Sequence, residues 1–585
     1  MPGLTFDRPL SPEIAQRYKR EGYWIGKNLI EYFDAAVARH PDKTAIVAGV
    51  ERLTYSQLAT EVNRVAYHLQ LLGIGAGDVV SVQLYNTPEF VMIHLAASRL
   101  GAITNPLLHN YRASELTYIL GLAKSKIAII PQLYRKFDYP AMYAGMWPQL
   151  PALEHVFVLG GPGHKGMRPF DALRAPVPVA ARKERQDAVR RAGVGEGTGN
   201  SAATPEPQVP TAPTTGDDIT ALIFTSGTES RPKGVMHSHD TQMYGTLWMA
   251  KLLGLTADDI VWAPSPISHG TGFQWGVRQA ITLGATLVLQ DIWNPDEALK
   301  LIARERCTFT LGATPFAAML MESPLVGSLD LSSFRIFACA GAAIPHQLGV
   351  DMRQKIGCTL IGMWGMTECF VGSASAPDAP DDKLWGTDGC AMPGGELAIF
   401  DETRSQTLAP GEVGELAARG PFVALGYFGD PERSRETFTP EGWLFSNDLA
   451  TIDADGYIRL VGRKKEIVNR GGLKISVRQM EDYLVGHPKI LSVAIVGVPD
   501  RLLGEKSCAC VVPRGSQAIT LQEITDFLEA RQVARYKFPE YLVILPEMPT
   551  TPSGKIQKYV LRDNFVKGLY ILQLEGASSP VEIQL

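Results

Sequence analysis

The chain has 585 residues, of which 45% are hydrophobic and 20% are charged, and its formal net charge is -5. This is the composition of a globular protein, and the length exceeds what a single hydrophobic core needs, so we expect several subdomains. The weakly negative charge provides no basic surface for nucleic acid or acidic membranes, which argues against a polyanionic partner.

The N-terminal residues and the cysteines indicate a cytoplasmic protein. Charges interrupt residues 1–26 where a signal peptide needs an apolar core, and no run of about 18 apolar residues could form a transmembrane segment. Seven cysteines are scattered along the chain, and no CxxC pair or His-rich cluster suits zinc. We expect reduced, mainly buried thiols.

Helical and strand patterns alternate in the first part of the chain, from residue 27 to residue 159. Apolar residues at helical spacing are separated by short apolar runs that are typical of strands. This alternation predicts α/β layering in a first subdomain. The predicted helices are 28–40, 55–73 and 89–101, and the predicted strands include 79–83 and 127–130.

The next stretch, residues 174–216, is rich in Pro, Ala, Gly, Thr and charge and holds little that could be buried, so we expect a surface insertion or linker. The α/β alternation resumes at Ile219 and continues to about residue 390, after which short strands and turns predict a small β-rich unit. The remainder has the size of one compact α+β domain. We therefore expect domains at 1–462 and 463–585.

The segment TSGTESRPKG, residues 225–234, follows an apolar run and precedes a helical pattern at 240–254. Hydroxyls, backbone N–H groups and Lys233 between a strand and a helix can surround phosphate, so this is a phosphate-loop candidate. It is not a Walker A loop, because no GK[ST] occurs in it. Taken alone, a surface turn rich in Ser, Thr and Gly is the alternative.

Four separated motifs follow one another in a fixed order: TSGTESRPKG, WGMTE at 364–368, GWLFSNDLATIDADGYIRLVGRKKEIVNRGG at 442–472, and PTTPSGKIQK at 549–558. In order and spacing they resemble the adenylate-forming acyl-CoA synthetase superfamily of AMP-binding enzymes, over about residues 20–565 apart from the insertion. HGTGF, RCTFTLGATPF and ARYKFPE are similar to the branch that contains short- and medium-chain acyl-CoA synthetases and cyclohexanecarboxylate–CoA ligases.

The resemblance implies an α/β fold with a large N-terminal adenylation domain of two stacked α/β subdomains and a small distorted β-barrel. A small mobile α+β C-terminal domain follows, with the active site expected at the junction. It implies an AMP-forming acid–thiol ligase: the acid attacks the α-phosphorus of ATP, pyrophosphate leaves, and CoA accepts the acyl group. Negative charge develops in this step, so Mg²⁺ and fixed cations are expected beside ATP.

Alternatives stay open at this point. The acceptor thiol could be the pantetheine of a carrier protein in place of free CoA. A non-catalytic member of the fold that only binds nucleotide, and a luciferase-like oxygenase, share the same motifs, because fold alone does not decide function. A homodimer is an open alternative to a monomer. Neither a nucleic acid nor a membrane span is expected.

The resemblance assigns the nucleotide site residue by residue. The hydroxyl-rich loop covers the β- and γ-phosphates, Trp364 lies against adenine where the family more often has Tyr, and Glu368 holds Mg²⁺. We leave out Glu229 and Ser230, which depart from the usual loop pattern, because a carboxylate near phosphate is unfavourable. The expected ATP/AMP-binding residues are Thr225, Ser226, Gly227, Thr228, Lys233, Gly341, Ala342, Trp364, Gly365, Met366, Thr367, Asp448 and Arg463.

Within that set, Thr367 meets the phosphates and is expected to be catalytic together with Glu368 and Lys555. Asp448 takes the place of the aspartate that accepts both ribose hydroxyls, although Asn447 replaces the glycine that usually precedes it. Asn tolerates the same turn conformation. Read without the family, the Thr-Glu pair is a helix-start signal and Asp448 a turn residue.

The C-terminal motifs imply a moving domain. Lys555 is expected to stabilise charge between the acid and the α-phosphate during adenylation and to leave before thiolation. Lys465 matches the hinge of the family, and Gly471 and Gly472 allow the backbone close to the pantetheine arm of CoA. The plain alternatives are solvated surface lysines and an ordinary turn.

The resemblance places the acyl pocket at Gly245, His269, Gly270, Ala340 and Met363. Small residues there leave room for a bulky or elongated apolar group. Relatives that activate dihydroxybenzoate or salicylate typically have Asn where this chain has Gly270, so we expect a medium-chain, alicyclic or simple aromatic acid. His269 could equally be a core histidine.

Overall fold

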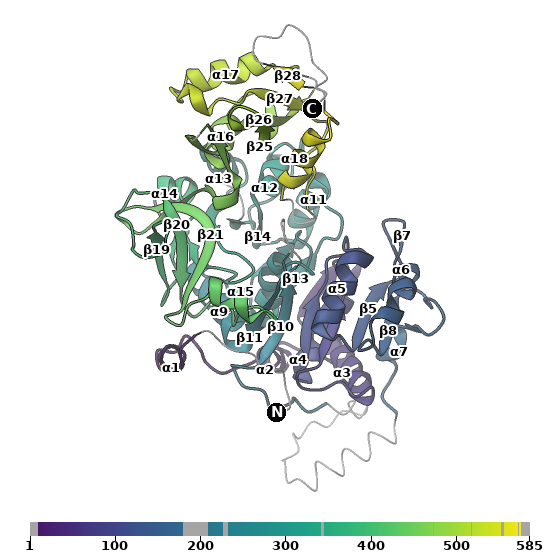
Figure 1. Cartoon of the computed structure of the whole chain (residues 1–585). Coiled ribbons are helices and arrows are strands. Elements are labelled where there is room, and N and C mark those ends of the chain that lie inside the picture. The colour runs from purple at the N-terminus through teal and green to yellow at the C-terminus, as the bar shows by residue number, and fades with distance from the viewer. Residues whose placement is uncertain are drawn as a thin grey trace. The chain divides into compact units, whose positions relative to one another are not determined.

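The computed structural model describes residues 10–178, 209–225, 232–340, 344–471, 473–515, 517–551, 555–570 and 572–574. The chain divides into two compact units. Figure 1 labels the helices and strands along the chain. The first comprises Met1–Leu311, Thr367–Phe370 and Pro421–Gly442, and the second comprises Gly312–Met366, Val371–Gly420 and Trp443–Leu585. This division differs from the domain boundary expected at residue 462, which stays a prediction.

The first unit contains a seven-stranded, mainly parallel sheet with the antiparallel strand β11 at one edge. Its core is a cluster of apolar side chains that includes Leu107, Leu116 and Ile130. The strand order is β11 (Gly234–Ser238), β10 (Ile219–Phe224), β4 (Ile103–Pro106), β3 (Val79–Val82), β5 (Ile127–Pro131), β8 (His155–Leu159) and β9 (Arg168–Pro169).

A second sheet in this unit has the strand order β14-β12-β13-β1-β2, and the boundary between the units falls inside β14. The strands β14, β12 and β13 are parallel, and β2 is an antiparallel edge strand. Their bounds are β14 (Phe309–Ala313), β12 (Ile260–Ala263), β13 (Thr286–Leu289), β1 (Thr44–Ala48) and β2 (Glu51–Thr54).

The predicted N-terminal helices are confirmed, and their starts follow from local chemistry. Asn28 and Thr54 form capping boxes with Glu31 and Gln57, which satisfy backbone N–H groups that a helix start leaves free. Pro88 opens the third helix, where its missing N–H costs nothing. That helix is buried on nearly every side, which requires protein on all its faces. The three helices are α2 (Leu29–Arg39), α3 (Tyr55–Leu71) and α4 (Pro88–Arg99).

The second unit begins with strands β15 (Ile336–Ala340), β16 (Thr359–Trp364), β17 (Ser373–Ala374) and β18 (Cys390–Ala391), which pair in this order. A four-stranded antiparallel sheet follows and confirms the predicted β-rich unit. Its strands are β19 (Glu396–Phe400), β20 (Gly414–Arg419), β21 (Trp443–Ile452) and β22 (Ile458–Arg463).

The C-terminal part of this unit is an α+β segment with its own core, formed around Ile475, Ile524 and Leu542. The long antiparallel pair β25 and β26 lies at its centre. Its strands are β23 (Ile467–Arg470), β24 (Leu473–Ser476), β25 (Ile490–Asp500), β26 (Gly504–Pro513), β27 (Tyr541–Ile544) and β28 (Leu572–Leu574), and its helices are α16 (Val477–Val485), α17 (Leu521–Glu529) and α18 (Lys558–Val566).

Part of the predicted insertion is packed. Residues 179–208 lie outside the described residues, but Val209 is buried and its N–H donates to Asn63 Oδ1 at 3.1 Å. Ala212 N–H donates to Arg99 O at 2.8 Å. The predicted insertion therefore extends too far toward residue 216. Nothing in the sequence indicated this, because the buried Val209 lies in a stretch rich in Pro and Thr.

The cysteines and the apolar helices are the remaining features predicted from the sequence. The seven cysteines are free thiols, and all are buried except Cys390, which is half-buried, as predicted. Burial raises the pKa of Cys339 to about 12, so this thiol is protonated at neutral pH. Among the described residues, no helix combines the length and apolar character needed to cross a membrane.

Candidate active site

The phosphate-loop candidate connects the two strands of a β-hairpin. β10 and β11 are antiparallel, and Thr225 N–H donates to Lys233 O at 3.0 Å across the mouth of the loop. The helix α9 (His239–Leu253) begins only after β11, with Ser238 as its N-cap. The predicted helix is present, but the loop does not lead directly into it, because β11 lies between them. Ser226, Gly227 and Thr228 lie outside the described residues.

Lys233 is held beside Glu368 by a tyrosine. Lys233 Nζ donates to Tyr427 Oη at 2.9 Å, and Tyr427 Oη donates to Glu368 Oε1 at 2.7 Å. Lys233 Nζ itself lies 3.7 Å from Glu368 Oε1. Burial first, and the Glu368 charge second, raise the pKa of Tyr427, so its hydroxyl stays a donor. The first unit thus places a cation and a buried carboxylate side by side.

Thr367 is positioned by a neutral histidine. His237 Nε2 lies 2.7 Å from Thr367 O, and its ring stacks on Phe370 with centroids 4.4 Å apart. Burial lowers the pKa of His237 to about 4, against the opposing effect of the hydrogen bond to Thr367. The imidazole is therefore uncharged at pH 7 and donates from Nε2. This contact fixes the backbone from which Thr367 and Glu368 project.

Asp448 lies in the second unit, and each of its carboxylate oxygens accepts a hydrogen bond. Trp364 Nε1 donates to Oδ2 at 2.9 Å, and Arg463 Nε donates to Oδ1 at 3.0 Å. The carboxylate is buried. Gly372 lies against the indole of Trp364, where an added Cβ would come within 2.3 Å of the ring. The structure thus brings three of the predicted nucleotide-binding residues together.

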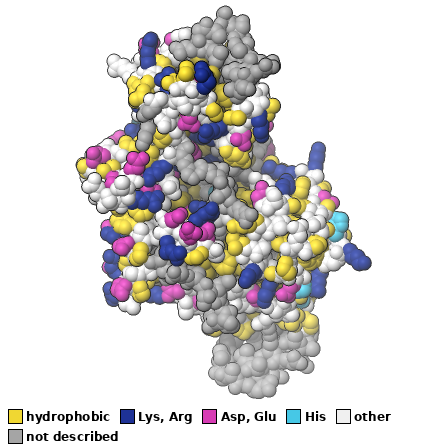
Figure 2. Space-filling model, viewed as in Figure 1, with side chains coloured by type: hydrophobic (Ala, Val, Ile, Leu, Met, Phe, Trp, Pro, Cys, Tyr) yellow, Lys and Arg dark blue, Asp and Glu magenta, His cyan; other side chains and the backbone are white. Residues whose placement is uncertain are grey.

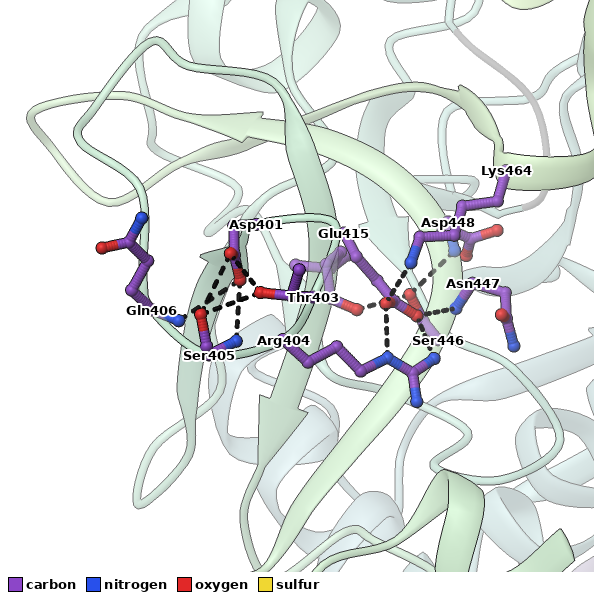
Figure 3. Close-up of polar contacts among 11 residues, drawn as sticks. Asp401, Thr403, Arg404, Ser405, Gln406, Glu415, Ser446, Asn447, Asp448 and Lys464 are labelled. Atoms are coloured by element: carbon purple, nitrogen blue, oxygen red, sulfur yellow. Dashed lines mark hydrogen bonds and ion pairs between the residues drawn. The ribbon is translucent and has the colours of Figure 1, made fainter.

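A buried carboxylate, Glu415 on β20, holds the irregular part of β21 that contains Asn447 and Asp448 (Figure 3). Arg404 donates to both of its oxygens at 2.7 Å, and Lys464 Nζ donates at 2.6 Å. Asn447, in the left-handed region with φ 61°, donates its N–H to the same carboxylate at 3.2 Å. Glu415 therefore connects the part of β21 that presents Asp448 with Lys464, the residue that precedes the predicted hinge.

The charge on Glu415 is stabilised by these donors. Burial alone would raise the pKa of Glu415, but the hydrogen bonds and charges of Arg404 and Lys464 outweigh burial and lower it below its ordinary value of 4.5. The side chain is completely buried. Sequence reasoning missed Glu415, Tyr427 and His237, because each acts through a partner that is distant in the sequence.

Lys555 is paired through its backbone, since Thr551 N–H donates to Lys555 O at 2.7 Å. Although the residue is exposed, loss of solvent around its amine first, and the charge of Arg463 second, lower the pKa of Lys555 to about 8. Glu466 and Asp448 oppose this shift. The amine is thus close enough to Asp448 and Arg463 for their charges to act on it.

The expected hinge and CoA channel are described only in part. The side chain of Lys465 and the residue Gly472 lie outside the described part of the chain. Gly471 has φ 57°, which favours glycine, and its N–H donates to Leu503 O at 2.7 Å. Nearby, Lys558 pairs with both Glu466 and Glu481 and connects α18 to α16 and the 3₁₀ turn after β22.

The residues expected in the acyl pocket lie in both units. Gly245 is on α9, and His269 and Gly270 precede the π-helix η2 (Gly272–Arg278) in the first unit. An added Cβ at Gly270 would come within 3.2 Å of the Phe370 ring, so this aromatic side chain occupies the space beside the glycine. Ala340 ends β15 and Met363 is buried in β16, while Gly341 and Ala342 lie outside the described residues. Gly365 and Met366 directly follow β16.

Among the described residues, no three or more His, Cys, Asp or Glu side chains form a cluster that could hold a metal by themselves. Glu368 fits Mg²⁺ in a different way, because this ion is commonly held by one or two carboxylates together with substrate phosphates and water. On the visible face of the molecule, acidic and basic side chains are mixed (Figure 2).

Comparison with known proteins identifies the class. Residues 33–428 match the family described as AMP-binding enzyme, and residues 479–555 match the AMP-binding enzyme C-terminal domain. The chain therefore belongs to the AMP-binding enzymes, which are adenylate-forming acid ligases, and the predicted fold class is confirmed. Enzymes of this family use ATP, Mg²⁺ and CoA.

The chain is similar over most of its length to several acid ligases. The chain is 36% identical to the medium-chain fatty-acid–CoA ligase of Escherichia coli (strain K12), over 94% of this chain and 93% of the relative. It is 30% identical to the 2,3-dihydroxybenzoate-AMP ligase of Bacillus subtilis (strain 168), over 95% and 97%. The structure of the anthranilate CoA ligase AuaEII with anthranoyl-AMP superposes with a TM-score of 0.80 at 26% identity, covering 93% of this chain and 98% of that one.

We expect Glu415→Gln to lower the free energy of unfolding by about 2–3 kcal/mol, because it leaves two cations without their buried partner. Glu396→Gln is the matched control, since its pair with Arg419 is exposed and contributes less than about 1 kcal/mol. Because the folded pKa of Glu415 is lowered, its stabilisation is complete at pH 7 and decreases as the pH falls below 4.5. Urea unfolding of the wild type and both variants at pH 7 and at a pH below 4.5 measures these free energies. Equal losses of stability in Glu415→Gln and Glu396→Gln would contradict the prediction.

Proposed function

We propose that the chain is an ATP-dependent acid–CoA ligase that converts a carboxylic acid to its acyl adenylate, releases pyrophosphate and transfers the acyl group to CoA. The observation that carries this proposal is the arrangement around Asp448. A buried carboxylate suited to ribose hydroxyls has Trp364 on one oxygen, Arg463 on the other, and the amine of Lys555 within electrostatic reach. Cations beside a carboxylate that binds the ribose could stabilise the negative charge that develops on the phosphate.

The remaining residues would have distinct roles. Lys233 and the loop beginning at Thr225 would hold the outer phosphates, and Thr367 would contact the phosphates. Glu368 would exchange its contact with Tyr427 for Mg²⁺, which would neutralise charge on the phosphates when bound. Asp448 would accept the ribose hydroxyls, and Lys465 would be the hinge. Gly471 and Gly472 would admit the pantetheine arm.

The acid would be medium-chain, alicyclic or simple aromatic. The medium-chain fatty-acid–CoA ligase relative supports the first of these. Gly270, with Phe370 beside it, offers no side chain for a ring hydroxyl and supports a substrate other than hydroxybenzoates. A second candidate function is the loading of a carrier protein, which a 30% identical salicyl-S-ArCP synthetase from Mycobacterium tuberculosis favours. The cytoplasmic location and the open question of a homodimer stay predictions.

An assay of both half-reactions tests the proposal. With ATP, Mg²⁺ and a panel of acids that varies chain length and ring type, we expect exchange of labelled pyrophosphate into ATP for at least one acid. Adding free CoA without any carrier protein should then yield the acyl-CoA thioester. Exchange without thioester formation would support carrier loading, and no exchange with any acid would contradict the adenylation proposal itself.

Lys555→Ala should separate the two half-reactions. Its amine is proposed to act only while charge develops at the α-phosphate, so we expect pyrophosphate exchange to fall by about 10²-fold or more. Thioester formation from preformed acyl adenylate should remain near the wild-type rate. The exposed residue Lys567→Ala, which is near the same C-terminal helix, is the control for general effects. Equal loss of both half-reactions in Lys555→Ala would contradict the role proposed for Lys555.

The lowered pKa of Lys555 predicts a pH profile. Because the amine must be charged to stabilise phosphate, kcat/KM for adenylation at limiting ATP should decline as the pH rises through about 8. A lysine with the ordinary pKa of 10.5 would sustain activity to much higher pH. Lys555→Arg should remove this decline from whatever activity it retains, because its charge persists. A wild-type profile that is flat through pH 9 would refute the assignment.

A further inference from the structure

Arg278, the last residue of η2, has a buried guanidinium that pairs with no carboxylate in the part of the chain that the structure describes. Its side chain is completely buried in the first unit. Nη1 lies 3.3 Å from His94 Nε2, Nη2 lies 3.6 Å from Met243 Sδ, and Nε has no hydrogen-bond partner. Burial lowers the pKa of Arg278 to about 9, which still leaves it charged at neutral pH. An unpaired buried charge of this kind is unfavourable and needs an explanation.

The two histidines near Arg278, His94 and His239, provide no negative charge to pair with the guanidinium, and they carry no positive charge of their own. Burial lowers the pKa of His94 well below its ordinary value and lowers that of His239 to about 3, and Arg278 adds to both shifts. Both imidazoles are therefore neutral. His94 Nδ1 lies 2.8 Å from Thr104 Oγ1, so Nε2 is free to accept from Arg278. This leaves a single positive charge among neutral polar groups.

Other buried polar atoms in this region also have no partner. They are on α9 and on the adjoining helical segment: Gln242 Nε2 and Oε1, His239 Nδ1, Gln274 Oε1 and Gln279 Oε1. The two segments are connected by Gln274 Nε2, which donates to Gln242 O at 2.8 Å, and by Gln279 Nε2, which donates to Thr246 O at 3.0 Å. Buried polar atoms are nearly always paired, so a cluster of unpaired ones indicates a ligand or water with polar groups.

The backbone supports a ligand site. η2 is a π-helix, a conformation that is rare and frequently found at functional sites. It begins directly after the pocket residues His269 and Gly270 and ends at Arg278, nine positions after His269. His269 therefore precedes one end of η2 and Arg278 forms the other, an arrangement that suits the two ends of an elongated acid. Gly245 lies on α9 between Gln242 and Thr246.

We infer that Arg278 binds a second carboxylate at the far end of the substrate, so that the preferred acid is an elongated dicarboxylic acid. Arg278 would donate to this carboxylate in a charge-assisted pair, and the amide of Gln242 would donate a further hydrogen bond. This inference rests on the proposed function and refines it. The proposal of an acid other than a hydroxybenzoate came from Gly270, which precedes the opposite end of η2.

Matched pairs of straight-chain mono- and dicarboxylic acids of equal length test the inference. With wild-type enzyme, we expect kcat/KM in pyrophosphate exchange to be at least about tenfold higher for the dicarboxylic acid. Arg278→Met should lower the ratio of the two kcat/KM values by at least about tenfold, and Arg278→Lys should retain part of the preference. The dicarboxylic acid alone should raise the thermal unfolding midpoint of the wild type more than that of Arg278→Met.

Gln242→Glu is a second variant for the case that Arg278→Met does not fold. It places a carboxylate among the same buried polar atoms, so it should compete with the substrate and remove the preference for the dicarboxylic acid. A preference for the monocarboxylic acid in the wild type, or a ratio that neither variant changes, would overturn the inference. If no acid of either kind supports exchange, the proposed adenylation function fails instead, and the thermal shift still reports whether Arg278 binds a dicarboxylic acid.

Discussion

The neutralisation of buried charge by partners from distant parts of the chain is the constraint on which the candidate site depends. Glu415 is the clearest case, because one fully buried carboxylate accepts from Arg404, Lys464 and the Asn447 backbone. These bonds stabilise the left-handed conformation of Asn447 within β21, and Asp448 is the next residue in that strand. The position of a proposed ribose ligand therefore depends on an ion pair that would not itself touch the nucleotide (Figure 3).

The same principle organises the first unit in a different form. Tyr427 bridges Lys233 and Glu368, so neither charge is buried alone, and the neutral His237 fixes Thr367 without adding a charge. Such a site holds its groups in place before a ligand arrives, which reduces the reorganisation that binding requires. In the proposed complex, Glu368 would exchange the Tyr427 hydroxyl for Mg²⁺, and Lys233 would donate to phosphate oxygens, so that both side chains keep a partner of opposite charge.

Sequence reasoning predicted the parts of the fold that local patterns determine. The capped, amphipathic segments at Asn28 and Thr54 became helices, and alternating short strands predicted the sheet β19–β22. It predicted the helix after the loop but missed the five-residue strand β11, because residues 235–239 between the predicted loop and the predicted helix were not assigned to any element. It also could not find Glu415, Tyr427 or Arg278, since a buried charge is recognisable only once its surroundings are known.

Arg278 shows why an unpaired charge is informative about specificity. A pocket lined only by apolar side chains discriminates weakly between acids of similar size, whereas a buried group that lacks its partner penalises every substrate that cannot supply one. Arginine suits this role, because its guanidinium stays charged where a histidine in the same surroundings becomes neutral, as His94 and His239 do. The cost of holding this charge unpaired would be recovered only when the matching acid binds, which couples recognition to the far end of the substrate, away from the carboxylate that reacts.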